Sequence, residues 1–115
     1  MNILTELNTM LDSIGIPVET GVFSEKPPAY YVVLTPLTDN FEVFGDNLPT
    51  METCEVRLSL FNFGNYVKRK DSIVKNLLER GFTITERRYI GFDKENGFHN
   101  YAIDVAKEYE FKEDN

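Results

Sequence analysis

The clearest pattern in the chain is an alternation of apolar and polar residues near its middle. The apolar positions of this run are Cys54, Val56, Leu58 and Leu60. Alternation with a period of two sends one set of side chains to a core and the other set to the opposite face of a strand. The pattern therefore predicts a strand over residues 51 to 61 that is buried on one face.

Directly after this strand the apolar spacing changes to the three or four residues of a helix. The stripe consists of Tyr66, Lys70, Ile73, Val74, Leu77 and Leu78, in which Lys70 is the one polar member. Asn65 can cap the first free N–H groups, and Gly81 can adopt the left-handed conformation that ends a helix. We therefore expect a helix over residues 66 to 80.

Two more strands are expected after the helix. Thr83–Phe92 is rich in β-branched and aromatic residues, and Phe98–Tyr109 alternates between two faces. The segment between them, Asp93–Gly97, ends in an Asn-Gly pair that tolerates positive φ. An antiparallel hairpin is the predicted arrangement.

The first half of the chain predicts one helix and one strand. Its helical stripe consists of Leu4, Leu7, Leu11 and Ile14 and stops at Gly15, and Pro17 cannot continue a helix. Ala29–Thr35 has the β-branched and aromatic composition of a strand. We expect Pro36 to end that strand.

The segment from Leu37 to Thr50 combines turn-forming residues with large apolar side chains. The apolar side chains that concern us are Phe41, Val43, Phe44 and Leu48. Exposed apolar patches on soluble proteins tend to mark interaction sites. We expect this segment to be a loop whose four apolar residues form an oligomer interface. The alternative is that they fold back onto the sheet of their own subunit as a small hairpin.

Together these elements predict a single domain over residues 1–115 with an α+β fold. The expected architecture is a mainly antiparallel sheet of four or more strands with two helices packed on one face. A chain of 115 residues can bury one core. We find no apolar run long enough to cross a bilayer and no basic-then-apolar leader, so we expect no membrane association and synthesis in the cytoplasm.

Candidate catalytic and metal-binding residues are few. The chain has one histidine, His99, and one cysteine, Cys54. Known metal sites need several nitrogen or sulfur ligands at fixed separations, and Asp93, Glu95 and Asp104 near His99 do not supply them. We expect a buried thiol at Cys54, a structural or surface role for His99, no metal, no cofactor and no enzymatic activity.

The charge of the chain argues against nucleic-acid binding. Its net charge is −7 and its pI is near 4.7, whereas nucleic-acid binding relies on Lys and Arg neutralising phosphates. The two basic clusters, Lys68–Lys70 and Glu86–Arg88, spread their side chains around a helix and over both faces of a strand. We expect both clusters to be solvated, and the charges of the second to pair across strands.

Several segments resemble the tail terminator, or tail completion, proteins of long-tailed phages and prophages. They are Lys26-Pro27-Pro28 leading into Tyr30–Val33, the strand Glu52–Phe61, Val74–Leu78 through Gly81-Phe82, and the turn Asp93–Gly97 leading into Phe98–Tyr101. The resemblance covers most of the chain and includes no catalytic motif. The apolar-bearing segment Phe41–Leu48 departs from the family pattern.

This resemblance implies a structural virion protein of the tail, a homo-oligomeric ring that usually has six subunits. Such a ring ends growth of the tail tube and joins it to the head, so its partners are the tail tube protein and the head–tail connector protein. Two alternatives stay open: another head–tail joining or minor capsid component, and a cytosolic, non-enzymatic binding module. In the binding module, Tyr30, Tyr31 and Phe63 are the candidate aromatic contacts.

Overall fold

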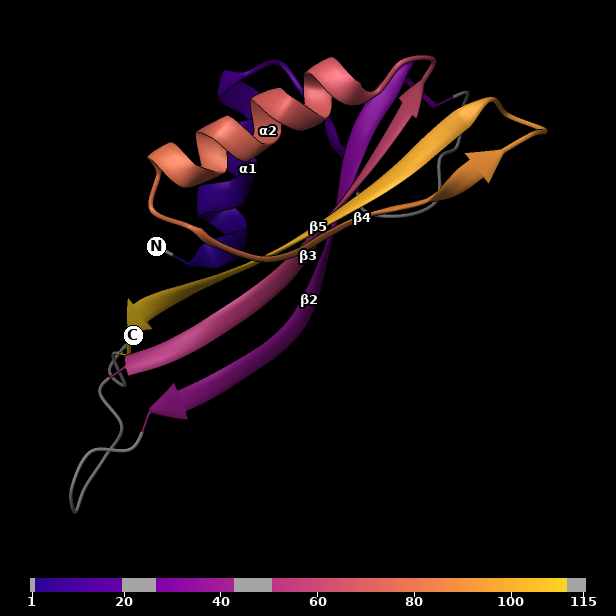
Figure 1. Cartoon of the computed structure of the whole chain (residues 1–115). Helices are drawn as coiled ribbons and strands as arrows, with labels where there is room; N and C mark the ends of the chain where they lie inside the picture. The colour runs from indigo at the N-terminus through magenta and orange to yellow at the C-terminus, as the bar shows by residue number, and fades with distance from the viewer. Residues whose placement is uncertain (1, 20–26, 43–50, 112–115) are drawn as a thin grey trace.

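A five-stranded sheet with strand order β1-β2-β3-β5-β4 forms the centre of the molecule (Figure 1). The computed structural model describes residues 2–19, 27–42 and 51–111. Its elements are α1 (Ile3–Ser13), β1 (Val18–Glu19), β2 (Tyr30–Glu42), β3 (Met51–Phe63), α2 (Val67–Glu79), β4 (Thr83–Asp93) and β5 (Phe98–Glu110). β1 and β2 are parallel, and all other neighbouring strands are antiparallel. The predicted α+β fold is confirmed.

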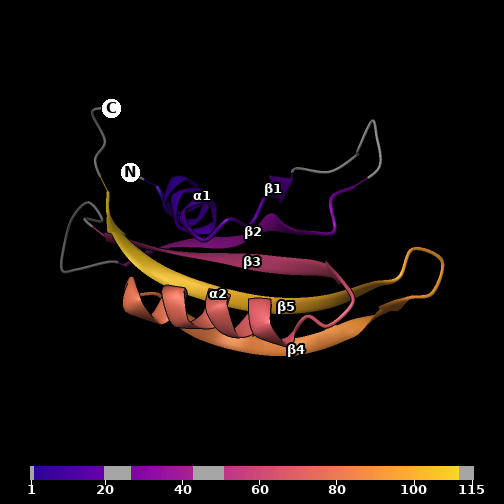
Figure 2. The ribbon, with the colours of Figure 1, turned by 90° about the horizontal axis from the view of Figure 1, so that it is seen from above.

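Both helices pack on one face of the sheet, and the core lies between. α1 contacts β1 and β3, whereas α2 contacts β4, so each helix covers a different half of the curved sheet (Figure 2). Fully buried side chains from the two helices include Leu7, Met10, Leu11, Ile73 and Leu77. They meet an inward row of the two central strands that includes Val56, Leu58, Leu60, Ile103 and Val105. The predicted alternation in β3 is confirmed, with Cys54 among its buried side chains.

The predicted second helix is confirmed to within one residue at each end. The Asn65 side chain accepts a hydrogen bond from the Val67 N–H at 3.0 Å, and Gly81 closes the helix with a φ of 83°. The prediction for Leu78 was wrong, because its side chain is 58% exposed although it belongs to the apolar stripe. Leu78 lies about 100° around the helix from the fully buried Leu77 and therefore at the margin of the buried face.

β2 does not end at Pro36, as the sequence predicted, but continues to Glu42 opposite Met51–Glu55. Its pairing register shifts between Pro36 and Thr38, which marks a bulge. Proline lacks the N–H donor of a strand ladder and is tolerated at bulges and edge strands. β2 is such an edge here, because β1 pairs with it only at Val32 and Val33. The expectation of a loop is therefore wrong for residues 37–42.

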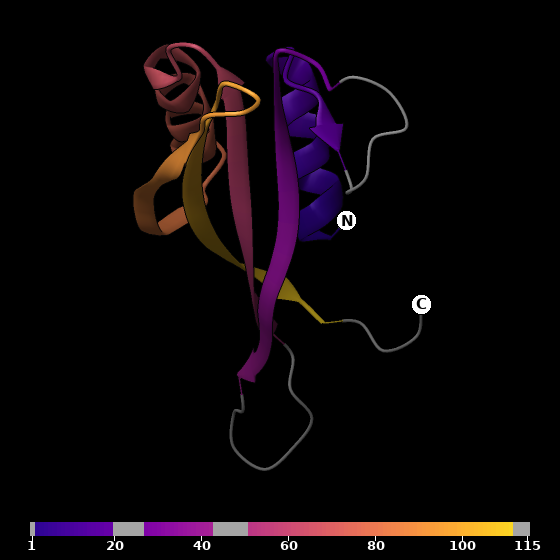
Figure 3. The same cartoon turned by 90° about the vertical axis from the view of Figure 1, so that its right-hand side faces the viewer.

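Three strands are much longer than the helices that cover them. β2, β3 and β5 have 13 residues each and span roughly 43 Å at about 3.3 Å per residue. α1 and α2 have 11 and 13 residues and span roughly 17 to 20 Å at about 1.5 Å per residue. β2 and β3 therefore continue past both helices (Figure 3). We call this ribbon, Leu37–Glu42 with Met51–Thr53, the arm.

A polar contact joins the last strand to the first helix beside the arm. The Glu6 carboxylate on α1 accepts hydrogen bonds from Lys107 Nζ at 2.6 Å and from the Tyr109 hydroxyl at 3.0 Å. Lys107 also donates to the carbonyl oxygen of Arg80, directly after α2. Burial, followed by the bond to Glu6, raises the pKa of the Tyr109 hydroxyl well above its ordinary value. Lys107 therefore connects β5 to both helices, and Tyr109 adds a second bond to α1 that requires its hydroxyl to be protonated.

Substituting Tyr109→Phe should lower the stability at neutral pH and make it less sensitive to alkali. The pKa of Tyr109 is higher in the folded protein than the value of about 10 expected in the unfolded chain. Its contribution to the free energy of unfolding is therefore complete below about pH 10 and is lost as pH rises toward the folded pKa. The free energy of unfolding of the wild type should therefore fall more steeply between about pH 10 and pH 12 than that of the variant. Urea titrations at several pH values would measure both slopes, and equal slopes would contradict this role of Tyr109.

Candidate functional site on the arm and the open face

The arm exposes apolar side chains, as expected of an interaction surface. Phe41 is 51% exposed, and its ring meets that of Phe111 edge-on at a centroid distance of 4.9 Å. Leu37, at the base of the arm, is also exposed. Of the four residues predicted to form the oligomer interface, Phe41 is thus on the surface. Val43, Phe44 and Leu48 lie outside the described residues.

The sheet has two unlike edges. Within the described residues, the outer edge of β2 from Leu34 to Glu42 has no neighbouring strand, and neither has the outer edge of β4. β4 also exposes Ile90 and Phe92 near its end. Edge strands present unpaired N–H and C=O groups to which another strand can add. The free edge of β2 on one molecule and the free edge of β4 on a second molecule are therefore two different surfaces that are available to pair with each other.

The sheet face opposite the helices, which we call the open face, carries a groove of about 520 Å³. Its centre is a row of residues paired across four strands: Tyr31, Phe61, Asn100 and Gly91. The Tyr31 and Phe61 rings stack at 5.0 Å, and Phe98 meets Tyr31 edge-on at 5.8 Å. Gly91 has no side chain, and a Cβ placed there would meet no other atom within 4 Å. The groove therefore opens toward β4 beside Asn100.

Asn100 and Asp93 are polar residues in the lining of the groove, and the side-chain oxygen of Asn100 is itself buried. Asn100 Oδ1 has no hydrogen-bond partner within the described part of the chain. Asp93, also in the lining, accepts bonds from the Asn96 side chain and from the N–H groups of Asn96 and Glu95, and these bonds lower the pKa of its carboxyl group. Asp93 is consequently ionised at neutral pH. The lining of the groove therefore carries a negative charge at Asp93.

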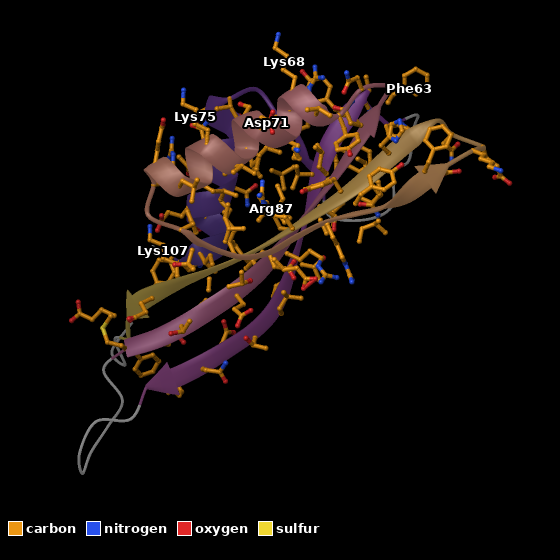
Figure 4. The ribbon with its side chains drawn as sticks, viewed as in Figure 1. Phe63, Lys68, Asp71, Lys75, Arg87 and Lys107 are labelled. Atoms are coloured by element: carbon orange, nitrogen blue, oxygen red, sulfur yellow. The ribbon has the colours of Figure 1, made fainter. Side chains whose placement is uncertain are left out.

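The three aromatic residues proposed for a binding module are separated by the sheet. Tyr31 lines the groove, and Phe63 meets Phe98, another lining residue, edge-on at 6.1 Å. Figure 4 shows Phe63 at the end of β3. Tyr30 faces the opposite side, where the Arg69 guanidinium carbon lies 3.5 Å from the centre of its ring. Two of the three predicted contacts thus share one surface. The sequence did not indicate Asn100 as their neighbour.

His99 lies on the helix side of the sheet among aromatic rings. Its Nδ1 is 2.9 Å from the Tyr89 hydroxyl, and its ring lies 4.7 Å from that of Phe92. Asp104 is on the open face, where it accepts two hydrogen bonds from Arg57 at 2.8 and 3.0 Å. Across residues 2–19, 27–42 and 51–111, no three potential metal ligands of the His, Cys, Asp and Glu types gather. The acidic residues near His99 in the sequence therefore do not converge on it.

The two basic clusters have different surroundings. Lys68 points away from the sheet into solvent, as Figure 4 shows, whereas Arg69 packs on Tyr30. In the second cluster, Arg88 Nε lies 3.8 Å from a carboxylate oxygen of Glu86 on the same strand. The expected cross-strand pairing is therefore not what the structure shows, because Glu86 and Arg88 are two apart and share one face.

No protein-family model matches the sequence, and no curated protein matches it. None of the helices in the described ranges is long and apolar enough to span a membrane. The geometry of the arm, the two sheet edges and the groove is therefore the basis for a functional proposal.

Proposed function

We propose that this chain is a structural subunit of a phage tail. In this proposal the subunits form a homo-oligomeric ring, with six as the expected number, that stops growth of the tail tube and joins it to the head connector. The observation that carries the proposal is the arm, which extends past the helices and exposes Leu37 and Phe41. Apolar side chains on such a projection gain free energy when a neighbouring subunit covers them.

The two unlike edges support a ring rather than a symmetric dimer. A head-to-tail contact uses two different surfaces on each subunit and closes into a ring when the rotation between subunits permits. The arm, where β2 extends beyond its short pairing with β1, and the edge of β4 provide two such surfaces on opposite sides of the sheet. The net charge of −7 is compatible with a ring through which DNA passes without binding.

The decisive experiment is measurement of tail tube length with and without this protein. Purified tail tube protein polymerises in the presence or absence of the chain, and negative-stain images give the distribution of lengths. We expect tubes to stop growing and to carry a ring at one end when the chain is present. Unchanged lengths, with the protein monomeric beside the tubes, would refute the terminator function. A ring found at the head vertex alone would instead indicate another head–tail joining component.

A non-enzymatic binding module is the second candidate, and the groove on the open face favours it. The groove combines aromatic rings with the charge of Asp93, and ligand sites commonly combine apolar walls with a few polar groups. The two proposals concern different surfaces, so one molecule could carry out both functions.

A further inference from the structure

We infer that the arm of one copy of this chain adds as a strand to the β4 edge of a second copy, in an antiparallel pairing that places Asp39 opposite Arg87. The inference rests on the self-association in the proposed function and specifies the surfaces and the register of that contact. Two independent observations support it: the distribution of charge over the molecule, and the fit between the unpaired parts of the two edges.

Charge is distributed unevenly between the two sides of the sheet. The segment from α2 through β4, residues 67–93, contains seven Lys and Arg residues against four Asp and Glu. Residues 1–63, which run from the N-terminus to the end of β3, contain two Lys and Arg residues against nine Asp and Glu. β4 is one outer strand of the sheet, and the arm lies toward the opposite side. The basic side of one copy is therefore complementary in charge to the acidic side of another.

The charges on the two edges favour a head-to-tail pairing over a symmetric one. Arg87 and Arg88 are exposed in the middle of β4, and Asp39 is exposed on the arm. Neither Arg87 nor Asp39 takes part in an ion pair with another described residue. Two β4 edges would bring arginines together, and two arms would bring carboxylates together. Like charges on paired strands are destabilising and opposite charges are stabilising, so the arm should pair with β4.

Asp39 and Arg87 lie on the same face of the sheet, as this pairing requires. Asp39 is opposite Cys54 in the ladder of β2 with β3, and Arg87 is opposite Ile103 in the ladder of β4 with β5. Cys54 and Ile103 both belong to the core under the helices, and residues opposite each other in a ladder share a face. β2 and β4 run in opposite directions within one molecule. A second copy with its helices on the same side therefore places its arm antiparallel to β4.

This register also avoids the part of β2 that is already paired. β1 occupies the outer edge of β2 at Val32 and Val33. Val33 is six residues before Asp39, and Asp93, the last residue of β4, is six residues after Arg87. In an antiparallel pairing, Val33 of the second copy therefore falls at the end of β4. The second copy's β1 then begins where β4 ends, so the two strands do not compete for the same edge.

The test measures self-association of the purified full chain by analytical ultracentrifugation at low salt, without tail tubes. The β4 variant is Arg87→Glu with Arg88→Glu, and the arm variant is Thr38→Lys with Asp39→Lys. Each should associate at least about tenfold more weakly than the wild type, because each replaces attraction between the edges by repulsion. The chain with all four substitutions should associate within about threefold of the wild type, because its reversed edges attract each other again. Thermal unfolding of each variant verifies that it is folded.

Lys68→Glu with Lys75→Glu is the matched control for the β4 variant. It makes the same change of net charge on the exposed side of α2, where both side chains point away from the sheet (Figure 4). The control should associate within about threefold of the wild type, because neither residue lies on a sheet edge. Hydrogen exchange tests strand addition itself: N–H groups on the outer edge of β4 should exchange more slowly in the associated chain than in the free chain.

Three results would overturn the inference. The first is a wild-type chain that stays monomeric up to its solubility limit, which would leave the two edges to strands of another protein. The second is a chain with all four substitutions that associates no better than the β4 and arm variants. The third is association without added protection in β4. Tail tube length separates this contact from the tail function: shortened tubes with any of these results would reject the contact alone, and the expected association beside tubes of unchanged length would reject the terminator function alone.

Discussion

Substituting Leu58→Ala should lower the free energy of unfolding by about 2 to 5 kcal/mol. Leu58 is fully buried in β3, the middle strand of the sheet, and lies in the core between the sheet and the helices. Removing its side chain deletes apolar contacts and leaves a cavity that the neighbouring residues fill only in part. Because whole domains are stable by about 5 to 15 kcal/mol, this one change should be visible as a large shift of the urea midpoint.

Leu78→Ala is the matched control, because it makes the same chemical change on α2. The Leu78 side chain is 58% exposed, so the expected loss is within about 0.5 kcal/mol. Both leucines belong to apolar patterns in the sequence, yet the structure buries only one. If the two variants lost the same free energy of unfolding, Leu78 could not lie on the exposed side of α2.

Local patterns predicted most of the elements because they depend on neighbouring residues alone. The alternation through Leu58 indicates a strand wherever the strand lies in the sheet, and the Asn65 and Gly81 signals mark the ends of α2 without knowledge of its neighbours. The parallel strand β1 was missed because two residues, Val18 and Glu19, are too few to show a period. Its existence depends on β2, to which it is hydrogen-bonded.

The arm and the groove could not be predicted, because both depend on strand order and register. Pro36 is compatible with a strand only at an edge or a bulge, and the sequence does not specify which strands are edges. The groove joins residues from the β4–β5 hairpin with residues from β2 and β3, which lie far from the hairpin along the chain. Tyr31 was predicted as an aromatic contact and does line the groove, and Gly91 was a second available signal, since glycine inside a strand often marks a close approach by a ligand or another backbone.

The double substitution Phe41→Asp with Phe44→Asp should abolish ring assembly while leaving the subunit folded. Phe41 is already half exposed, so a charge there costs the free subunit little. In the assembly, each phenylalanine that a neighbour buries contributes roughly 1.5 to 3 kcal/mol before the cost of association, and an aspartate there would be a buried, unpaired charge. Losing both side chains should therefore weaken association at least about a hundredfold.

Light scattering at high protein concentration and images of the chain with tail tubes would measure the effect. Leu78→Asp is the control, because it places the same charge at an equally exposed apolar position on α2, away from the arm. The control should assemble as the wild type does, and the thermal unfolding of both variants should stay close to that of the free wild-type subunit. If the double variant still forms rings, or if the control fails equally, the arm is not the contact that closes the ring.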